Sequence, residues 1–273
     1  MQPILSHTRI TAEEAEPQHW LLFLHGIYGS GRNWATIARR LVEARPEWGA
    51  LLVDLRLHGD SAGFDPPHTV EAAAADVARL VEQLEAPVDA VLGHSFGGKV
   101  ALAYARDHGA GLKQVWVVDS TLAVREPSGS AWRLIDAVRS LPERFPDREA
   151  LAEGLASHGY PAPLASWLGM NLERAGDEFR WKLDWDGVES MLRDYFRSDL
   201  WEVVESPPGG VEVHVIRAAS SDSLSEQDVA RIERAGEEGA ATRVHVLDGG
   251  HWINVENPDA VVDLLSRELP ASA

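Results

Sequence analysis

Six short apolar runs alternate with longer segments of helical periodicity along this chain. Such alternation is typical of a parallel sheet whose two faces are covered by helices. We therefore expect an α/β fold with a mostly parallel, doubly wound sheet. The expected strands are residues 20–24, 51–54, 88–92, 115–119, 211–216 and 244–247, and the expected helices are residues 34–44, 69–84, 100–108 and 258–267.

The segment 120–201 interrupts this alternation, because it contains no convincing strand. A segment of this length is too long for a simple loop in a compact domain. We interpret it as a helical cap, inserted into an α/β core formed by residues 1–119 and 202–273. Five of the ten Trp residues lie in it, and they either line an apolar ligand pocket or pack the cap onto the core: Trp132, Trp167, Trp181, Trp185 and Trp201.

The composition excludes several kinds of partner. The net charge is −18, from 43 acidic and 25 basic residues, which disfavours nucleic acid and anionic lipid surfaces. No apolar run approaches the roughly 18 residues that span a bilayer, so we expect no integral membrane association. The chain has no Cys, and residues 1–10 lack a basic stretch followed by an apolar one, so we expect no secretory signal. Both observations fit a reducing cytoplasm. We expect a cytoplasmic monomer or small homo-oligomer.

The pattern Gly93-His94-Ser95-Phe96-Gly97 lies between an expected strand and an expected helix. It matches G-x-S-x-G, in which a sharp strand-to-helix turn raises a serine above the sheet. The turn is so tight that its neighbouring positions need glycine. The helix N-terminus at this place favours developing negative charge. The pattern and its context therefore indicate that Ser95 is a nucleophile.

The same stretch, residues 93–99, also matches G-x-x-x-x-G-K, the phosphate-binding loop of nucleotide-binding proteins. In such loops the next residue is the Ser or Thr that binds Mg²⁺, whereas here it is Val100. A nucleotide site would also leave the pattern around His251 unexplained. We therefore disfavour this alternative.

A serine nucleophile needs a general base and donors for the oxyanion. In this arrangement the base follows the final strand, and His251 lies there, in Gly249-Gly250-His251-Trp252. One oxyanion donor comes from the loop after the first strong strand, and the other from the residue after the nucleophile. This order predicts His251 as the base and the N–H groups of Ile27 and Phe96 as the donors.

The carboxylate that orients His251 has two candidates. Asp222 follows the strand before last, which is the usual place for this acid. Asp119 ends the strand before the cap, and a carboxylate there can also reach the histidine. Sequence spacing alone does not choose between the two.

With these residues assigned, the chain resembles a particular branch of the α/β-hydrolases. This is the compact esterase and thioesterase branch that joins small bacterial acyl-esterases with mitochondrial abhydrolase-domain proteins. The matching blocks span most of the chain in the same order, and they imply an α/β-hydrolase fold. They are HGIYGSGRNW (25–34), VDLRLHGDS (53–61), GHSFGGKVAL (93–102), VVDS (117–120), FRWKLD (179–184) and GGHWINVENPDAV (249–261).

The resemblance favours Asp119 as the acid. The branch has a serine where other α/β-hydrolases have the Asp after the penultimate strand, and Ser221 aligns with that serine. Asp222 is then one residue out of register. The chain departs from the branch beside both candidates, with VVDST after the first strand and with Ala218-Ala219 after the second.

Two further matches to the branch are charged residues. We interpret Lys99 as a charge on a helix surface. We interpret Arg56 as an ion-pair partner of Asp54 or Asp60.

The resemblance implies hydrolysis of a small carboxylic ester or acyl thioester through an acyl-enzyme, with no cofactor and no metal. His25, Gly26, Trp252 and Trp181 are the expected substrate contacts. The same fold and triad also serve lyases, C–C hydrolases and peptidases. A non-catalytic binding module is a further alternative.

Overall fold

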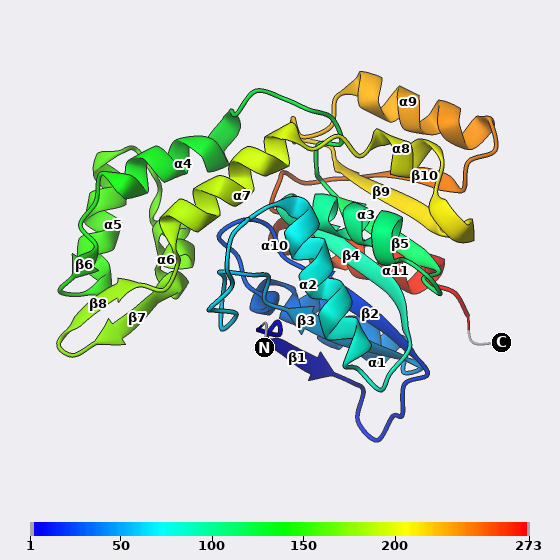
Figure 1. The fold of residues 1–273 in the computed structure, drawn as a ribbon, viewed down its shortest axis with the longest axis horizontal. Helices are drawn as coiled ribbons and strands as arrows, with labels where there is room; N and C mark the ends of the chain where they lie inside the picture. The colour runs from blue at the N-terminus through cyan, green and yellow to red at the C-terminus, as the bar shows by residue number, and fades with distance from the viewer. Residues whose placement is uncertain (1–2, 272–273) are drawn as a thin grey trace.

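The computed structural model describes residues 3–271, and a seven-stranded sheet forms its centre (Figure 1). The strand order is β1-β3-β2-β4-β5-β9-β10, in which only the edge strand β1 is antiparallel to its neighbour. The expected mostly parallel α/β sheet is therefore confirmed. Its strands are β1 (His7–Ile10), β2 (His19–Leu24), β3 (Trp48–Val53), β4 (Val88–His94), β5 (Gln114–Val118), β9 (Glu212–Ala218) and β10 (Thr242–Leu247).

Helices cover both faces of this sheet, namely α1 (Ala35–Ala44), α2 (Val70–Glu82), α3 (Phe96–His108), α9 (Glu226–Glu237) and α11 (Pro258–Glu268). Strand β2 shows why its sequence is continuously apolar. Leu22 and Leu24 pack with α2 and α3, whereas Leu21 and Phe23 pack with α1 and α11. Successive side chains of a strand point to opposite faces, so a strand with both faces covered needs apolar residues throughout.

The segment between β5 and β9 extends to one side of the sheet (Figure 1). Its α7 returns toward the core and packs on α2 and α3. We refer to residues 120–201 as the cap, with these bounds remaining a prediction. The whole segment between β5 and β9 contains α4 (Gly129–Arg139), α5 (Arg148–Ser157), α6 (Ala162–Leu168), the 3-10 turn η2 (Gly169–Asn171), α7 (Trp185–Arg197) and α8 (Trp201–Glu205).

The expectation that this segment has no strand is wrong. It contains a small antiparallel sheet of order β6-β8-β7, formed by β6 (Arg144–Phe145), β7 (Leu172–Ala175) and β8 (Glu178–Trp181). These strands have two to four residues, and most of their side chains are exposed or half-buried. They therefore lack the apolar run by which the strands of the main sheet were predicted. The exposed edge strand β1 escaped prediction for the same reason.

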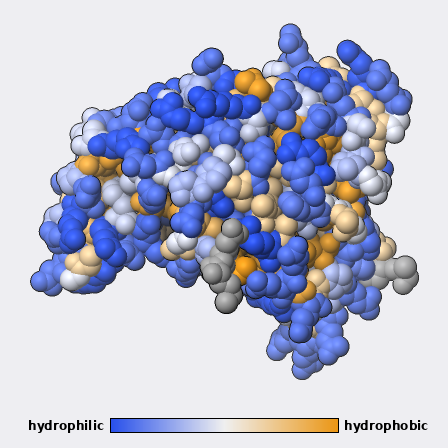
Figure 2. Space-filling view, in the orientation of Figure 1, coloured by the Kyte–Doolittle hydropathy of each residue, from blue (hydrophilic) through white to orange (hydrophobic). Residues whose placement is uncertain are grey.

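The surface seen in Figure 2 is mostly hydrophilic, with small and scattered apolar areas. This agrees with the high content of acidic residues. Between residues 3 and 271, no helix combines the length and the apolar character that crossing a bilayer requires. The remaining short helices are η1 (Gly31–Trp34), η3 (Pro208–Gly210) and α10 (Ile253–Glu256).

Candidate active site

Ser95 occupies the sharp turn between β4 and α3, with φ 52° and ψ −115°. This conformation is strained for a residue other than glycine. The turn is held to the next strand because the Ser95 N–H donates to the Val118 carbonyl at 3.0 Å. A Cβ atom on Gly93 would collide with the Gly97 carbonyl, and one on Gly97 would lie 2.6 Å from the His25 carbonyl. Both glycines of the pattern are therefore required by close backbone approach.

Asp119 and His251 are joined by a hydrogen bond of 2.7 Å between Oδ2 and Nδ1. Asp119 follows β5 directly and is fully buried. Its Oδ2 also accepts from the Ser221 hydroxyl at 2.6 Å, and its Oδ1 accepts from the Ala218 N–H at 3.2 Å. Burial raises the pKa of Asp119, but the hydrogen bonds from His251 and Ser221 outweigh this effect and hold the pKa below its ordinary value. Asp119 is therefore a carboxylate that can orient His251.

Asp222 lies elsewhere. Its side chain is exposed, and its carboxylate has no hydrogen-bond partner among the described residues. The neighbouring serines contact Asp119 and His251 instead. Ser221 donates to Asp119, and Ser223 Oγ lies 3.2 Å from His251 Nδ1. The structure thus brings Asp119 to His251 and leaves Asp222 at the surface. Sequence reasoning did not identify Ser223, although the run of serines after β9 was a signal.

The loop that carries His251 is fixed from two sides. His94 Nε2 donates to the His251 carbonyl at 2.8 Å, and burial lowers the pKa of His94 to about 3, so this imidazole is neutral. The Gly250 N–H donates to Glu256 in α10 at 2.6 Å. The ring of His251 lies beside that of His94, with centroids 4.7 Å apart.

The two predicted oxyanion donors, Ile27 and Phe96, are buried. Within residues 3–271, neither of their N–H groups has a hydrogen-bond partner. Buried N–H groups are almost always paired, so two unpaired N–H groups beside the candidate nucleophile Ser95 are suited to bind an oxyanion. The loop of Ile27 abuts the elbow, because a Cβ atom on Gly26 would lie 2.9 Å from the His94 ring and 3.3 Å from Ser95 Cβ.

Two buried histidines brace this loop. His25 Nε2 accepts from the Leu55 N–H at 3.0 Å, and its Nδ1 donates to the Gly26 carbonyl at 2.7 Å. His58 Nε2 accepts from the Tyr28 N–H at 3.1 Å. Burial lowers the pKa of His25 to about 4 and that of His58 to about 3, so both rings are neutral. Both ring nitrogens of His25, an expected substrate contact, are thus engaged by the main chain.

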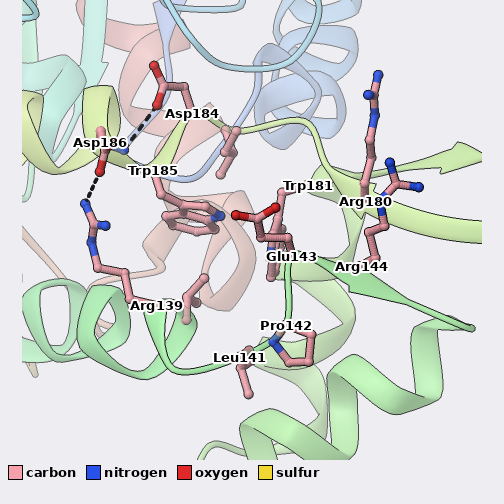
Figure 3. A pocket seen from close by; sticks show the side chains of 12 residues that line it. Arg139, Leu141, Pro142, Glu143, Arg144, Arg180, Trp181, Asp184, Trp185 and Asp186 are labelled. Carbon is pink, nitrogen blue, oxygen red and sulfur yellow. Dashed lines mark hydrogen bonds and ion pairs between the residues drawn. The ribbon is translucent and has the colours of Figure 1, made fainter.

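The two tryptophans predicted to contact substrate lie in different places. Trp252 follows His251, and its ring packs edge-on against Trp167 of the cap, with centroids 4.6 Å apart. Trp181 lines a cavity of about 470 Å³ inside the cap, beside Trp185 and Glu143 (Figure 3). None of the catalytic candidates lines that cavity. The structure therefore brings Trp252, but not Trp181, to the site.

The interpretations of the two charged residues need correction. Lys99 is fully buried, so it is not a charge on the helix surface. Its Nζ donates to three main-chain carbonyls. It is thus not placed to bind a phosphate, as the phosphate-loop alternative would require. Arg56 pairs with buried Asp76, at 2.5 Å, rather than with Asp54 or Asp60. Asp54 instead accepts from the N–H groups of the neighbouring loops.

The parallel sheet, the strained serine between strand and helix, and the histidine after the last strand are the features of an α/β-type hydrolase. A family model described as "Alpha/beta hydrolase family" matches residues 21–264. The chain therefore belongs to the alpha/beta hydrolase family.

Relatives of this chain carry the names of lipases and esterases. It is 30% identical over 241 residues to the sn-1-specific diacylglycerol lipase ABHD11 of Xenopus laevis, covering 86% of this chain and 75% of that protein. It is 26% identical to the esterase YbfF of Escherichia coli, covering 95% and 98% of the two chains. The solved structure of a marine microorganism esterase has the same fold, with a TM-score of 0.82 at 23% identity and coverage of 96% and 98%.

Proposed function

We propose that this chain hydrolyses small carboxylic esters, including acyl thioesters, through an acyl-enzyme on Ser95. The observation that carries the proposal is the 2.7 Å hydrogen bond from His251 to buried Asp119, at the sheet edge where the strained Ser95 lies. The relatives named as lipase and esterase support the same chemistry. The cysteine-free sequence suits a reducing compartment, which supports a cytoplasmic location.

In the acylation step, His251 Nε2 takes the proton of Ser95 Oγ while that oxygen attacks the substrate carbonyl carbon. The carbonyl oxygen becomes an oxyanion and accepts hydrogen bonds from the Ile27 and Phe96 N–H groups. The tetrahedral intermediate collapses, and the alcohol or thiol leaves with the proton from His251. Asp119 keeps His251 in the tautomer with hydrogen on Nδ1 and stabilises its charged form.

In the deacylation step, His251 takes a proton from water, and the hydroxide attacks the acyl carbon. The second intermediate breaks the bond to Ser95 Oγ, which recovers its proton from His251, and the carboxylic acid is released. Esters and thioesters share both steps and differ only in the leaving group, so one site serves both.

The test compares the wild-type chain with Ser95→Ala on p-nitrophenyl esters of increasing chain length and on matching acyl thioesters. Equal folding of the two proteins is checked by circular dichroism. We expect the wild type to turn over and the variant to lose at least a thousandfold in kcat/KM, in keeping with the roughly 10⁶-fold effect of a missing serine nucleophile.

Equal rates in both proteins would remove Ser95 from the mechanism. A wild type that cleaves neither series would contradict ester hydrolysis and would favour a lyase, C–C hydrolase or binding role. The chain-length profile also measures the size of the acyl pocket.

A further inference from the structure

A polar side chain of the cap contacts the loop that carries Ile27. Asn171 lies in η2 and is 7% exposed. Its Nδ2 donates to the Tyr28 carbonyl at 2.8 Å. A carbonyl oxygen can only accept a hydrogen bond, so the amide nitrogen of Asn171, and not its oxygen, faces Tyr28. Neither step of the proposed mechanism uses this contact.

Two peptide groups connect this contact with the proposed oxyanion donor. The Tyr28 carbonyl and the Gly29 N–H belong to one planar peptide group, and that N–H donates to the Gly26 carbonyl at 3.0 Å. The Gly26 carbonyl in turn shares its peptide group with the Ile27 N–H. Both groups are trans, so the carbonyl and the N–H of each point in opposite directions. A hydrogen bond to the carbonyl of either group therefore fixes the direction of its N–H.

The Ile27 N–H is held next to the candidate nucleophile. A Cβ atom on Gly26 would lie 3.3 Å from Ser95 Cβ, so this part of the loop contacts the elbow. The Gly26 carbonyl accepts from His25 Nδ1 at 2.7 Å as well as from the Gly29 N–H. Hydrogen bonds in series polarise one another, so the bonds that the Gly26 carbonyl accepts make the Ile27 N–H a stronger donor.

The loop needs contacts from outside to keep this geometry. Tyr28 has a φ of 65°, which is sparsely populated for a residue other than glycine. Its N–H donates to His58 of the core at 3.1 Å, and its carbonyl accepts from Asn171 of the cap. Among the described residues, no other group donates to that carbonyl. The orientation of the peptide group that bonds to Gly26 therefore depends on Asn171.

We propose that Asn171 is a positioning residue for the oxyanion hole, and that the cap acts on the chemical steps through it. The inference rests on the proposed function, because it concerns the donor Ile27 of the same site. In each tetrahedral intermediate, an oxyanion donor is effective when it already points to the place where the charge develops. Asn171 sets the direction of the Ile27 N–H in advance, through the peptide groups that follow Tyr28 and Gly26.

This role affects the chemical steps more than substrate binding. The carbonyl oxygen of a bound ester carries little charge, whereas the oxyanion of the intermediate carries a full one. A misdirected donor therefore lowers kcat and leaves KM almost unchanged. A contact that only attached the cap to the core would instead change KM and Tm, because its loss would move the walls of the substrate pocket.

The experiment compares the wild type with Asn171→Leu and Asn171→Ala. It measures kcat and KM for p-nitrophenyl acetate, and by calorimetry the dissociation constant of a trifluoromethyl ketone. Ser95 attacks such a ketone and passes its proton to His251, so the adduct carries an oxyanion. Asp194→Ala is the matched control, because Asp194 in α7 of the cap also bonds to the core main chain, accepting from the Val70 N–H at 2.7 Å. Thermal unfolding reports on folding.

We expect both Asn171 variants to lower kcat about 10- to 100-fold, less than the roughly 10²- to 10³-fold loss when an oxyanion donor is removed outright. KM stays within about twofold of the wild type, and the dissociation constant of the ketone rises by the factor by which kcat/KM falls. Asp194→Ala lowers Tm but keeps the wild-type kcat and ketone affinity.

Wild-type kcat in a folded Asn171 variant would overturn this role. An equal loss of kcat in Asp194→Ala would also overturn it, because attachment of the cap alone would then explain the effect. If Asn171→Leu does not fold, Asn171→Ala decides the claim in the same way. A wild type that binds the ketone but cleaves no ester would contradict only the proposed substrate class, and the ketone affinities would still test Asn171. A wild type that does neither would contradict both proposals.

Discussion

Ser95, Tyr28 and Asp119 are residues other than glycine with positive φ angles, of 52°, 65° and 44°. Each such conformation costs on the order of 1–3 kcal/mol and persists only where surrounding contacts enforce it. The Ser95 N–H donates to the Val118 carbonyl at 3.0 Å, and the Asp119 N–H donates to the Ile216 carbonyl at 2.8 Å. Adjacent parallel strands therefore hold Ser95 and Asp119 in their strained positions.

The first prediction concerns the acid. Asp119→Asn should lower kcat by about 10³- to 10⁴-fold, because an amide no longer stabilises the charged His251 and favours the wrong tautomer. Steady-state kinetics on p-nitrophenyl acetate measure this, with Asp222→Asn as the matched control. We expect the control to stay within about twofold of the wild type, since its carboxylate is exposed and unpaired among the described residues. The reverse pattern would assign the acid to Asp222.

Sequence reasoning located some site residues more readily than others. Ser95 and His251 were identified because each lies in a short local pattern at a defined place in chain order. The partner of His251 could not be derived from spacing, because Asp119 reaches it from another strand, 132 residues away.

At the scale of elements, the turn between β4 and α3 depends on backbone approach that only glycine permits. A Cβ atom on Gly93 would overlap the Gly97 carbonyl, a main-chain group that cannot rotate away. The G-x-S-x-G pattern at residues 93–97 therefore constrains how α3 packs on β4 as well as where Ser95 lies.

The second prediction follows from this packing. Gly93→Ala should destabilise the fold by about 1–3 kcal/mol or more, as overpacking does, and lower Tm by about 2–4 °C for each kcal/mol. Gly169→Ala is the control, because Gly169 has a helical φ of −61° and its Cβ would lie 3.5 Å from the nearest atom. Scanning calorimetry measures both. An unchanged Tm for Gly93→Ala would contradict the close approach.

Element prediction succeeded where burial shapes the sequence. The inner strands, such as β2, are apolar throughout because both faces are covered. Strands β1, β6, β7 and β8 are short and largely exposed, so their residues carry no comparable signal. Their pairing is set by tertiary context, which a single sequence does not display.

At the scale of the whole molecule, buried neutral histidines couple folding to pH. Burial lowers the pKa of His25 and His214 to about 4, and that of His58 and His94 to about 3. In the unfolded chain these groups titrate near pH 6.5. Between pH 6.5 and pH 4 the unfolded chain therefore binds more protons than the folded one. Stability must then fall as the pH is lowered through this window.

The third prediction is the size of this effect. Each of these histidines removes up to about 1.4 kcal/mol of unfolding free energy for each pH unit below 6.5. Urea unfolding at pH 7.5, 6.0 and 5.0 should show a falling midpoint, while His25→Gln should flatten the slope. Unfolding midpoints that stay constant from pH 7.5 to pH 5.0 would show that these imidazoles are not neutral and buried.

The most direct test of the central claim is to label the wild-type chain with a fluorophosphonate and map the adduct by peptide mass spectrometry while ester hydrolysis is followed. We predict a single adduct on the peptide that contains Ser95, with hydrolysis lost in proportion to labelling and neither observed in Ser95→Ala. Hydrolysis that persists after complete modification of Ser95, or an adduct on another residue that abolishes it, would contradict the account.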